Sequence, residues 1–192
     1  MVIRHYVAGM ADADTRPAQP ADAEELARIQ LATWREAYAR ILPAEVLAGF
    51  DPAATAEQWR QAIEHGRVFV AIEGDWLVGF VSAGPAPEAE SADAKGNPPP
   101  DASTVALIGT LLVEPRWGRR GHGGRLLAAA CDAMRNAGAT RGIVWVPEPD
   151  SAALSFYRRA GWQPDGTVRT LDAGGRPLRE VRLSGALDLE LI

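Results

Sequence analysis

Cysteine and metal-binding clusters are scarce in this sequence. Cys131 is the single cysteine, which rules out an internal disulfide bond. It falls among apolar residues at helical spacing, and no histidine or asparagine flanks it, so we expect a buried structural thiol rather than a nucleophile. No cluster of histidine, cysteine and aspartate has metal-ligand spacing, and we therefore expect no metal ion.

Long apolar runs and an excess of positive charge are also missing. No segment reaches the about 18 consecutive apolar residues of a membrane-spanning helix, and residues 1–14 lack the long apolar core of a signal peptide. The formal net charge of -5 argues against general binding to nucleic acids or membrane surfaces. These absences predict a cytoplasmic protein whose partners are neither nucleic acids nor membranes.

The remaining composition predicts one folded domain. The chain has 192 residues, of which 47% are hydrophobic and 23% are charged, which suits a single globular domain with a sizeable core. We expect residues 1–14 to form an N-terminal extension and residues 15–192 to form the domain.

The stretch from Leu111 to Gly138 has the pattern of a strand, a turn and a helix. Residues 106–113 form a nearly unbroken apolar run, which predicts a strand buried on both faces. From Gly123 onward apolar residues recur at helical spacing, and Gly138 stands at a C-terminal cap position. The turn between them is rich in glycine and arginine and leads into a helix N-terminus, whose free backbone N–H groups favour an anion. This pattern predicts a polyanionic ligand, such as one that bears phosphates.

Glycine-rich turns of this kind bind phosphates in three well-known types of loop. A Walker A loop needs Gly-Lys-Ser/Thr, whereas Gly124 is followed by Arg125, and a dinucleotide loop needs a third glycine where Leu126 stands. The turn instead resembles the acetyl-coenzyme A loop of the GNAT superfamily of N-acetyltransferases, Val-x-Pro-x-x-(Arg/Gln)-x-x-Gly-x-Gly-x-x-Leu-Leu. The matching residues are Val113, Pro115, Gly121, Gly123, Leu126 and Leu127. One position departs from the pattern, because Gly118 replaces the arginine or glutamine of the family.

Residues 150–162 resemble a second GNAT pattern, Asn-x-x-Ala-x-x-Phe-Tyr-x-x-x-Gly-Phe. Asp150 replaces the asparagine and Trp162 replaces the final phenylalanine. The matching residues are Ala153, Phe156, Tyr157 and Gly161. Asp150 or Ser151 can cap the helix of this motif, and Gly161 can end it.

The resemblance implies that the chain binds acetyl-coenzyme A as a cosubstrate. The backbone amides of residues 119–124 would hold the pyrophosphate, and the backbone of residues 111–113 would contact the pantetheine and the thioester, with N–H groups for the developing oxyanion. We expect His122 to contact phosphate or to be exposed. The expected cofactor-binding residues are Leu111, Leu112, Val113, Arg119, Arg120, Gly121, His122, Gly123, Gly124, Arg125 and Asp150.

The resemblance also places Tyr157 near the coenzyme sulfur, where its phenol could protonate the departing thiolate. The alternative is that Tyr157 only packs in the core. The general base is not identified, because the family position that often carries a glutamate is Leu107 here, and leucine cannot accept a proton. The candidates that stay open are Glu36, Glu90, Asp101, His65 and a chain of water molecules.

The first long helix is predicted to start at Asp22, with Glu25 in capping-box position. In the family, this helix and the loop after it form one wall of the acceptor site, and Trp34 and Tyr38 resemble that wall. Packing of the two rings on the core is an equally good interpretation.

The remaining elements follow from alternation and turn residues. The sequence predicts a helix at 53–65 and strands at 15–18, 67–73, 76–83, 142–146, 167–172 and 178–183. Residues 84–103 are rich in proline, and we expect a mobile loop there, without a regular element or a contribution to the core.

The resemblance implies an α/β (α+β) fold, a single GNAT-like domain with a mixed, mostly antiparallel sheet of about six or seven strands flanked by helices. A V-shaped splay is expected between the two central strands. The strands at 106–113 and 142–146 should be parallel neighbours joined by the helix at 123–137.

We therefore expect an N-acetyltransferase that moves an acetyl group from acetyl-coenzyme A to a primary amine of a small molecule, protein or peptide, by direct attack in a ternary complex. A homodimer is compatible with this expectation. Two other functions stay open: a non-catalytic acyl-coenzyme A binding or sensor domain, suggested by Leu107 and Gly118, and a nucleotide-binding domain, which the missing Lys-Ser/Thr disfavours.

Overall fold

The computed structural model describes residues 13–39 and 41–189. Over these residues the chain forms one sheet of seven strands in the order β1-β2-β3-β4-β5-β7-β6. The strands are β1 (Ala13–Pro17), β2 (Arg67–Glu73), β3 (Trp76–Pro85), β4 (Val105–Val113), β5 (Arg141–Pro147), β6 (Gln163–Asp172) and β7 (Pro177–Gly185). The α-helices are α1 (Ala23–Ala37), α2 (Ala44–Ala48), α3 (Pro52–His65), α4 (Glu88–Ser91), α5 (His122–Asn136) and α6 (Ser151–Arg159).

The sheet is mixed, because β4 and β5 are parallel while every other neighbouring pair is antiparallel. The strand-helix-strand unit β4-α5-β5 therefore has the arrangement predicted from the sequence. The hairpins β2–β3 and β6–β7 are confirmed as well, although β6 begins earlier than expected, at Gln163. These findings confirm a single domain with a mostly antiparallel sheet flanked by helices.

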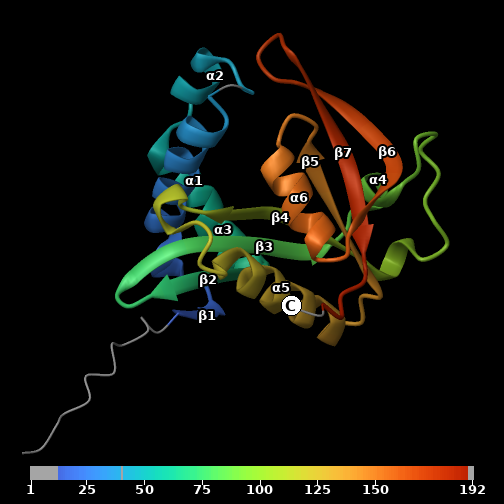
Figure 1. The fold of residues 1–192 in the computed structure, drawn as a ribbon, viewed down its shortest axis with the longest axis horizontal. Coiled ribbons are helices and arrows are strands. Elements are labelled where there is room, and N and C mark those ends of the chain that lie inside the picture. Colours follow the sequence, from blue (N-terminus) through green and yellow to red (C-terminus); the bar gives the residue numbers. More distant parts are fainter. Residues whose placement is uncertain (1–12, 40, 190–192) are drawn as a thin grey trace, which may run out of the picture.

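Helices cover both faces of the sheet (Figure 1). On one face, α1 and α3 pack against each other and against β2, β3 and β4 around a cluster that includes Phe80 and Trp59. On the other face, α5 packs against β1 to β4, and the core there also takes in Tyr157 and Trp162. The buried side of α5 includes Leu126, Leu127, Ala130, Cys131 and Met134, the residues whose spacing predicted the helix. Cys131 is buried, which confirms the expected buried thiol, and this burial raises its pKa to about 12.

The two central strands separate after a short stretch of pairing. Parallel pairing runs from Val105 and Arg141 to Ile108 and Val144 and goes no further. At the same point the register between β3 and β4 shifts, and the N–H of Thr110 donates to Oγ of Ser82 at 3.0 Å instead of to the main chain. This is a β-bulge around Gly109, and bulges bend the strand that carries them. In Figure 1, β5 and β7 accordingly turn steeply away from β3, which confirms the expected splay.

The N-terminal part of the domain differs from the sequence prediction in two details. β1 begins at Ala13 and pairs with β2 from Glu73 to Phe69, so residues 13 and 14 belong to the sheet rather than to the extension, whereas residues 1–12 lie outside the described residues. Asp22 does not cap α1 with its side chain. Its carboxylate instead pairs with Arg16 at 2.7 Å and accepts the N–H of Gln19, which uses the oxygens that a cap needs.

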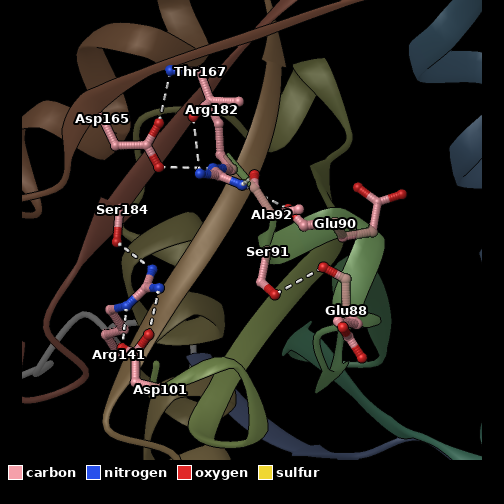
Figure 2. A network of polar contacts seen from close by, with 10 residues as sticks. All are labelled: Glu88, Glu90, Ser91, Ala92, Asp101, Arg141, Asp165, Thr167, Arg182 and Ser184. Atoms are coloured by element: carbon pink, nitrogen blue, oxygen red, sulfur yellow. Dashed lines mark hydrogen bonds and ion pairs between the residues drawn. The ribbon is translucent and has the colours of Figure 1, made fainter. Parts of the chain in front are cut away.

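The expectation that residues 84–103 form no regular element and bury nothing is wrong. β3 continues to Pro85, α4 spans residues 88–91, and Ser91 and Ala92 are buried. Figure 2 shows the cause: the guanidinium of Arg182 on β7 donates to the backbone carbonyls of Glu90 at 2.8 Å and Ala92 at 2.7 Å. Arg182 also donates to Asp165 and Thr167, so one buried arginine holds this segment against the sheet.

Candidate active site

A cavity of about 250 Å³ opens where β4 and β5 separate. Its floor is the two strands themselves, from Gly109 to Leu112 on β4 and from Val144 to Pro147 on β5. Since the strands no longer pair there, main-chain groups of both strands are available to a ligand. The other lining residues are Trp34, Tyr38, Ile41, Leu42, Ala153, Tyr157, Leu178 and Glu180. The structure therefore brings five residues expected for the site, Leu111, Leu112, Trp34, Tyr38 and Tyr157, to one cavity, and Val113 lies just beyond it on β4.

Trp34 and Tyr38 project from the end of α1 and form one wall. The ring of Trp34 packs edge-on against Phe50 at 4.9 Å between centroids and lies 6.3 Å from the ring of Tyr38. Burial and the negative charges of Asp150 and Glu180 raise the pKa of Tyr38 to about 12, so its phenol stays neutral. The wall is apolar and aromatic, with a hydroxyl group.

Tyr157 reaches the cavity from α6, whose N-cap residue is Asp150. The carboxylate of Asp150 caps the helix, because it accepts the N–H of Ala153 at 2.9 Å, and Gly161 ends the helix with φ 84°. Tyr157 is 5% exposed, and its ring lies 5.7 Å from that of Trp162. Burial above all raises the pKa of Tyr157 above its ordinary value of 10.0. The phenol is therefore held protonated, the state that a proton donor needs.

The glycine-rich loop lies between β4 and α5 and has two residues in the left-handed region, Arg119 with φ 62° and Gly121 with φ 83°. α5 starts at His122, directly after Gly121, and no side chain caps it. The N–H groups of residues 122–124 have no acceptor within the helix, which leaves them free for an anion. Gly121 thus provides the conformation that the loop requires.

Gly123 is needed for close packing of two helices, whereas Gly121 is needed for the conformation of the loop. It does not have a positive φ, but a Cβ atom there would lie 3.3 Å from Cε2 of Phe156. The glycine therefore lets α5 and α6 approach each other closely beside Leu111.

The arginines of the loop are turned in different directions. Arg120 pairs with Glu73 at 2.6 Å and lies over the ring of Trp117 at 4.9 Å, and Arg125 donates to the carbonyl of Arg120 at 3.1 Å. These contacts hold the side chains of Arg120 and Arg125 against neighbouring residues, while the guanidinium of Arg120 remains half exposed.

The expectation that His122 is exposed is wrong. Its side chain is 1% exposed, and its Nε2 atom lies 2.7 Å from Oε2 of Glu73 at the end of β2. The imidazole is thus buried against the carboxylate at the end of β2. The sequence held a signal for this burial, because His122 precedes Leu126 by one helical turn on the buried side of α5.

None of the side chains considered as general base lines the cavity in the described part of the chain. Glu90 pairs with Arg169, Asp101 pairs with Arg141, and Leu107 lies before the bulge, where β4 still pairs with β5. Glu36 and His65 are exposed. The carboxylate that does line the cavity is Glu180 on β7, which sequence reasoning missed.

Two further findings concern the described residues alone. No helix among them is long and apolar enough to span a membrane. No group of three or more histidine, cysteine, aspartate and glutamate side chains is arranged there to hold a metal ion.

The sequence matches known proteins over the part of the chain that contains this cavity and the glycine-rich loop. A family model described as "Acetyltransferase (GNAT) family" matches residues 24–162. The chain is 28% identical over 171 residues to the uncharacterized N-acetyltransferase YuaI of Bacillus subtilis (strain 168), and this alignment covers 88% of the chain and 90% of YuaI.

Solved structures share the fold. The PaiA N-acetyltransferase from Thermoplasma acidophilum in complex with coenzyme A superimposes with a TM-score of 0.69 at 18% identity, covering 91% of this chain and 98% of that one. The yncA protein from Salmonella typhimurium with its cofactor acetyl-CoA gives a TM-score of 0.66 at 16% identity, covering 92% and 94%. The family match spans both sequence motifs, the splayed strands and the loop at the start of α5, and this chain belongs to the GNAT family of acetyltransferases.

Proposed function

We propose that the protein transfers the acetyl group of acetyl-coenzyme A to a primary amine of a small molecule or peptide, by direct attack in a ternary complex. One observation carries the proposal: the cavity between β4 and β5 places Tyr157 beside the splayed strands, on the chain segment that follows β5. PaiA with coenzyme A and yncA with acetyl-CoA have the same fold, which supports the same donor here.

The residues present fit this donor. The amides of residues 119–124 would hold the pyrophosphate, with the left-handed turn at Gly121 and the uncapped start of α5 as the structural basis. Arg119, Arg120 and Arg125 would add positive charge. The main chain of residues 111–113, released from pairing with β5, would hold the pantetheine arm. Asp150 acts at this site through its cap of α6, which fixes the orientation of Tyr157.

The protein would stabilise the developing charge, position the acceptor and supply a proton. Bound acetyl-coenzyme A supplies an acyl group that is activated as a thioester. Main-chain N–H groups of β4 would stabilise the developing negative charge, and the wall formed by Trp34 and Tyr38 would exclude water and position the acceptor. Tyr157 would give a proton to the departing sulfur, since burial keeps its phenol protonated.

The test combines binding with turnover. Thermal unfolding with coenzyme A, acetyl-coenzyme A or ATP should show stabilisation by both coenzyme A species and not by ATP. Release of free thiol should then be measured with a panel of small amines and short peptides. Release that depends on the amine, with the acetylated amine detected by mass spectrometry, is the expected result. Binding without transfer to any amine would favour the acyl-coenzyme A sensor instead, and stabilisation by ATP alone would favour a nucleotide-binding domain.

A further inference from the structure

Glu180 is the only carboxylate among the described residues that line the cavity between β4 and β5. It lies on β7 opposite Pro147, at the end of β5 where the two central strands have separated. Its side chain is largely buried, with the whole residue 8% exposed. The described lining residues include no lysine or arginine, so the net charge of these side chains is negative.

The two oxygens of Glu180 have different surroundings. Oε2 accepts a hydrogen bond from Nε of Arg169 at 2.6 Å. Within the described residues no hydrogen bond engages Oε1. One oxygen is therefore fixed by the protein, and the other is available to a ligand in the cavity.

Arg169 does not neutralise this site. Its Nη1 atom donates to Oε2 of Glu90 at 2.7 Å, and its guanidinium lies over the ring of Trp145 at 4.3 Å. One guanidinium thus serves two carboxylates, which leaves one surplus negative charge beside an apolar, aromatic cavity. A partly buried carboxylate in surplus favours a cationic ligand, and aromatic faces favour cations as well.

We propose that Oε1 of Glu180 binds the ammonium group of the acceptor and takes one proton from it. This inference rests on the proposed acetyl transfer and names the residue that prepares its nucleophile. The neutral amine forms the C–N bond to the acetyl carbon while the C–S bond breaks. Of the two protons that nitrogen loses, one leaves through Glu180 to solvent, and the other restores the phenol of Tyr157 after Tyr157 has protonated the sulfur.

The experiment compares two acceptors that share a benzyl group. Benzylamine is an ammonium ion at neutral pH, whereas O-benzylhydroxylamine is uncharged and needs no deprotonation before attack. Glu180→Gln keeps an oxygen for Arg169 but removes the negative charge. Glu148→Gln is the control, because Glu148 is an exposed glutamate that pairs with a different arginine, Arg179, and does not line the cavity.

We expect Glu180→Gln to lower kcat/KM by about 10²-fold with benzylamine and by less than about threefold with O-benzylhydroxylamine. Glu148→Gln should change both by less than about threefold, and both variants should keep the affinity for acetyl-coenzyme A by calorimetry. If Glu180→Gln does not fold, Glu180→Asp keeps the ion pair while it withdraws the carboxylate, and the same selective loss with benzylamine is expected.

The failures can be told apart. A wild-type protein that acetylates neither acceptor nor any amine or peptide of the panel overturns the proposed transfer together with this inference. If the wild type is active, an equal loss with both acceptors, or no loss with benzylamine, overturns the role of Glu180 and leaves the transferase function intact.

Discussion

The Nε2 atom of His122 lies 2.7 Å from Oε2 of Glu73, so the first residue of α5 is tied to the last residue of β2. The other oxygen of Glu73 accepts from Arg120 at 2.6 Å. One carboxylate therefore fixes two positions of the glycine-rich loop, which the left-handed Arg119 and Gly121 otherwise leave with little support.

Replacing Glu73 should loosen this loop. We expect Glu73→Gln to lower the Tm and to raise the Kd for coenzyme A, measured by thermal unfolding and calorimetry. Burial alone would raise the pKa of Glu73, but hydrogen bonds from His122 and Arg120 hold it below the ordinary value of 4.5. The stabilisation by this carboxylate is therefore present above pH 4.5 and is lost as the pH falls through the folded-state pKa.

The Tm difference between wild type and Glu73→Gln should accordingly shrink on acidification. Glu148→Gln is the control, since Glu148 is an exposed glutamate that also pairs with an arginine, Arg179. An equal change of coenzyme A affinity in both variants would contradict a specific role of Glu73.

Gly121 and Gly138 flank α5 with similar left-handed conformations, φ 83° and 93°. Alanine at either position should cost about 1–2 kcal/mol of stability, because a Cβ atom is strained there. Gly121→Ala should also weaken the binding of coenzyme A, whereas Gly138→Ala, at the far end of the helix, should leave it unchanged. Calorimetry on the two proteins decides whether the loop binds the donor.

Tyr157→Phe separates catalysis from binding. The ring still packs beside Trp162, so the Tm and the affinity for acetyl-coenzyme A should be retained, while turnover falls by about 10²-fold. Because burial raises the pKa of Tyr157 above 10.0, wild-type activity should show no loss from ionisation of this phenol at any pH below that value. A rate within about threefold of wild type, with chemistry rate-limiting, would make Tyr157 a packing residue.

The indole of Trp162 fills the space beside Gly142 and Gly185, which are partners across β5 and β7. A Cβ atom on Gly185 would lie closer to the indole than real Cβ atoms come to any neighbour, so Gly185→Ala should cost about 1–3 kcal/mol. Gly84→Ala is the matched control in a strand, since nothing lies within 4 Å of its Cβ position. Chemical denaturation of both variants measures the difference.

Local patterns explain which features could be predicted from the sequence. The apolar side of α5 and the caps of α6 at Asp150 and Gly161 depend on residues only a few positions apart, and the structure has them where they were predicted. The parallel pairing of β4 and β5 follows from the length of the chain that joins them.

Features that depend on distant residues could not be predicted in this way. Glu180 reaches the cavity because β7 pairs with β5 in one register, and the sequence offers 25 acidic residues without a sign of which one does so. The segment at residues 88–92 is held by Arg182, about ninety positions away in the chain. The prolines of residues 84–103 led to the wrong expectation of no regular element there, and they gave no sign of the arginine that holds this segment.

The cavity beside the bulge at Gly109 is lined by two strands and by side chains from other elements. The strand after the bulge offers backbone groups, which are the same whatever side chains the strand carries. The opposite wall consists of side chains, Trp34, Tyr38 and Leu178 among them. On the proposed function, variants at these three positions should change which amines are accepted while the affinity for the donor stays constant.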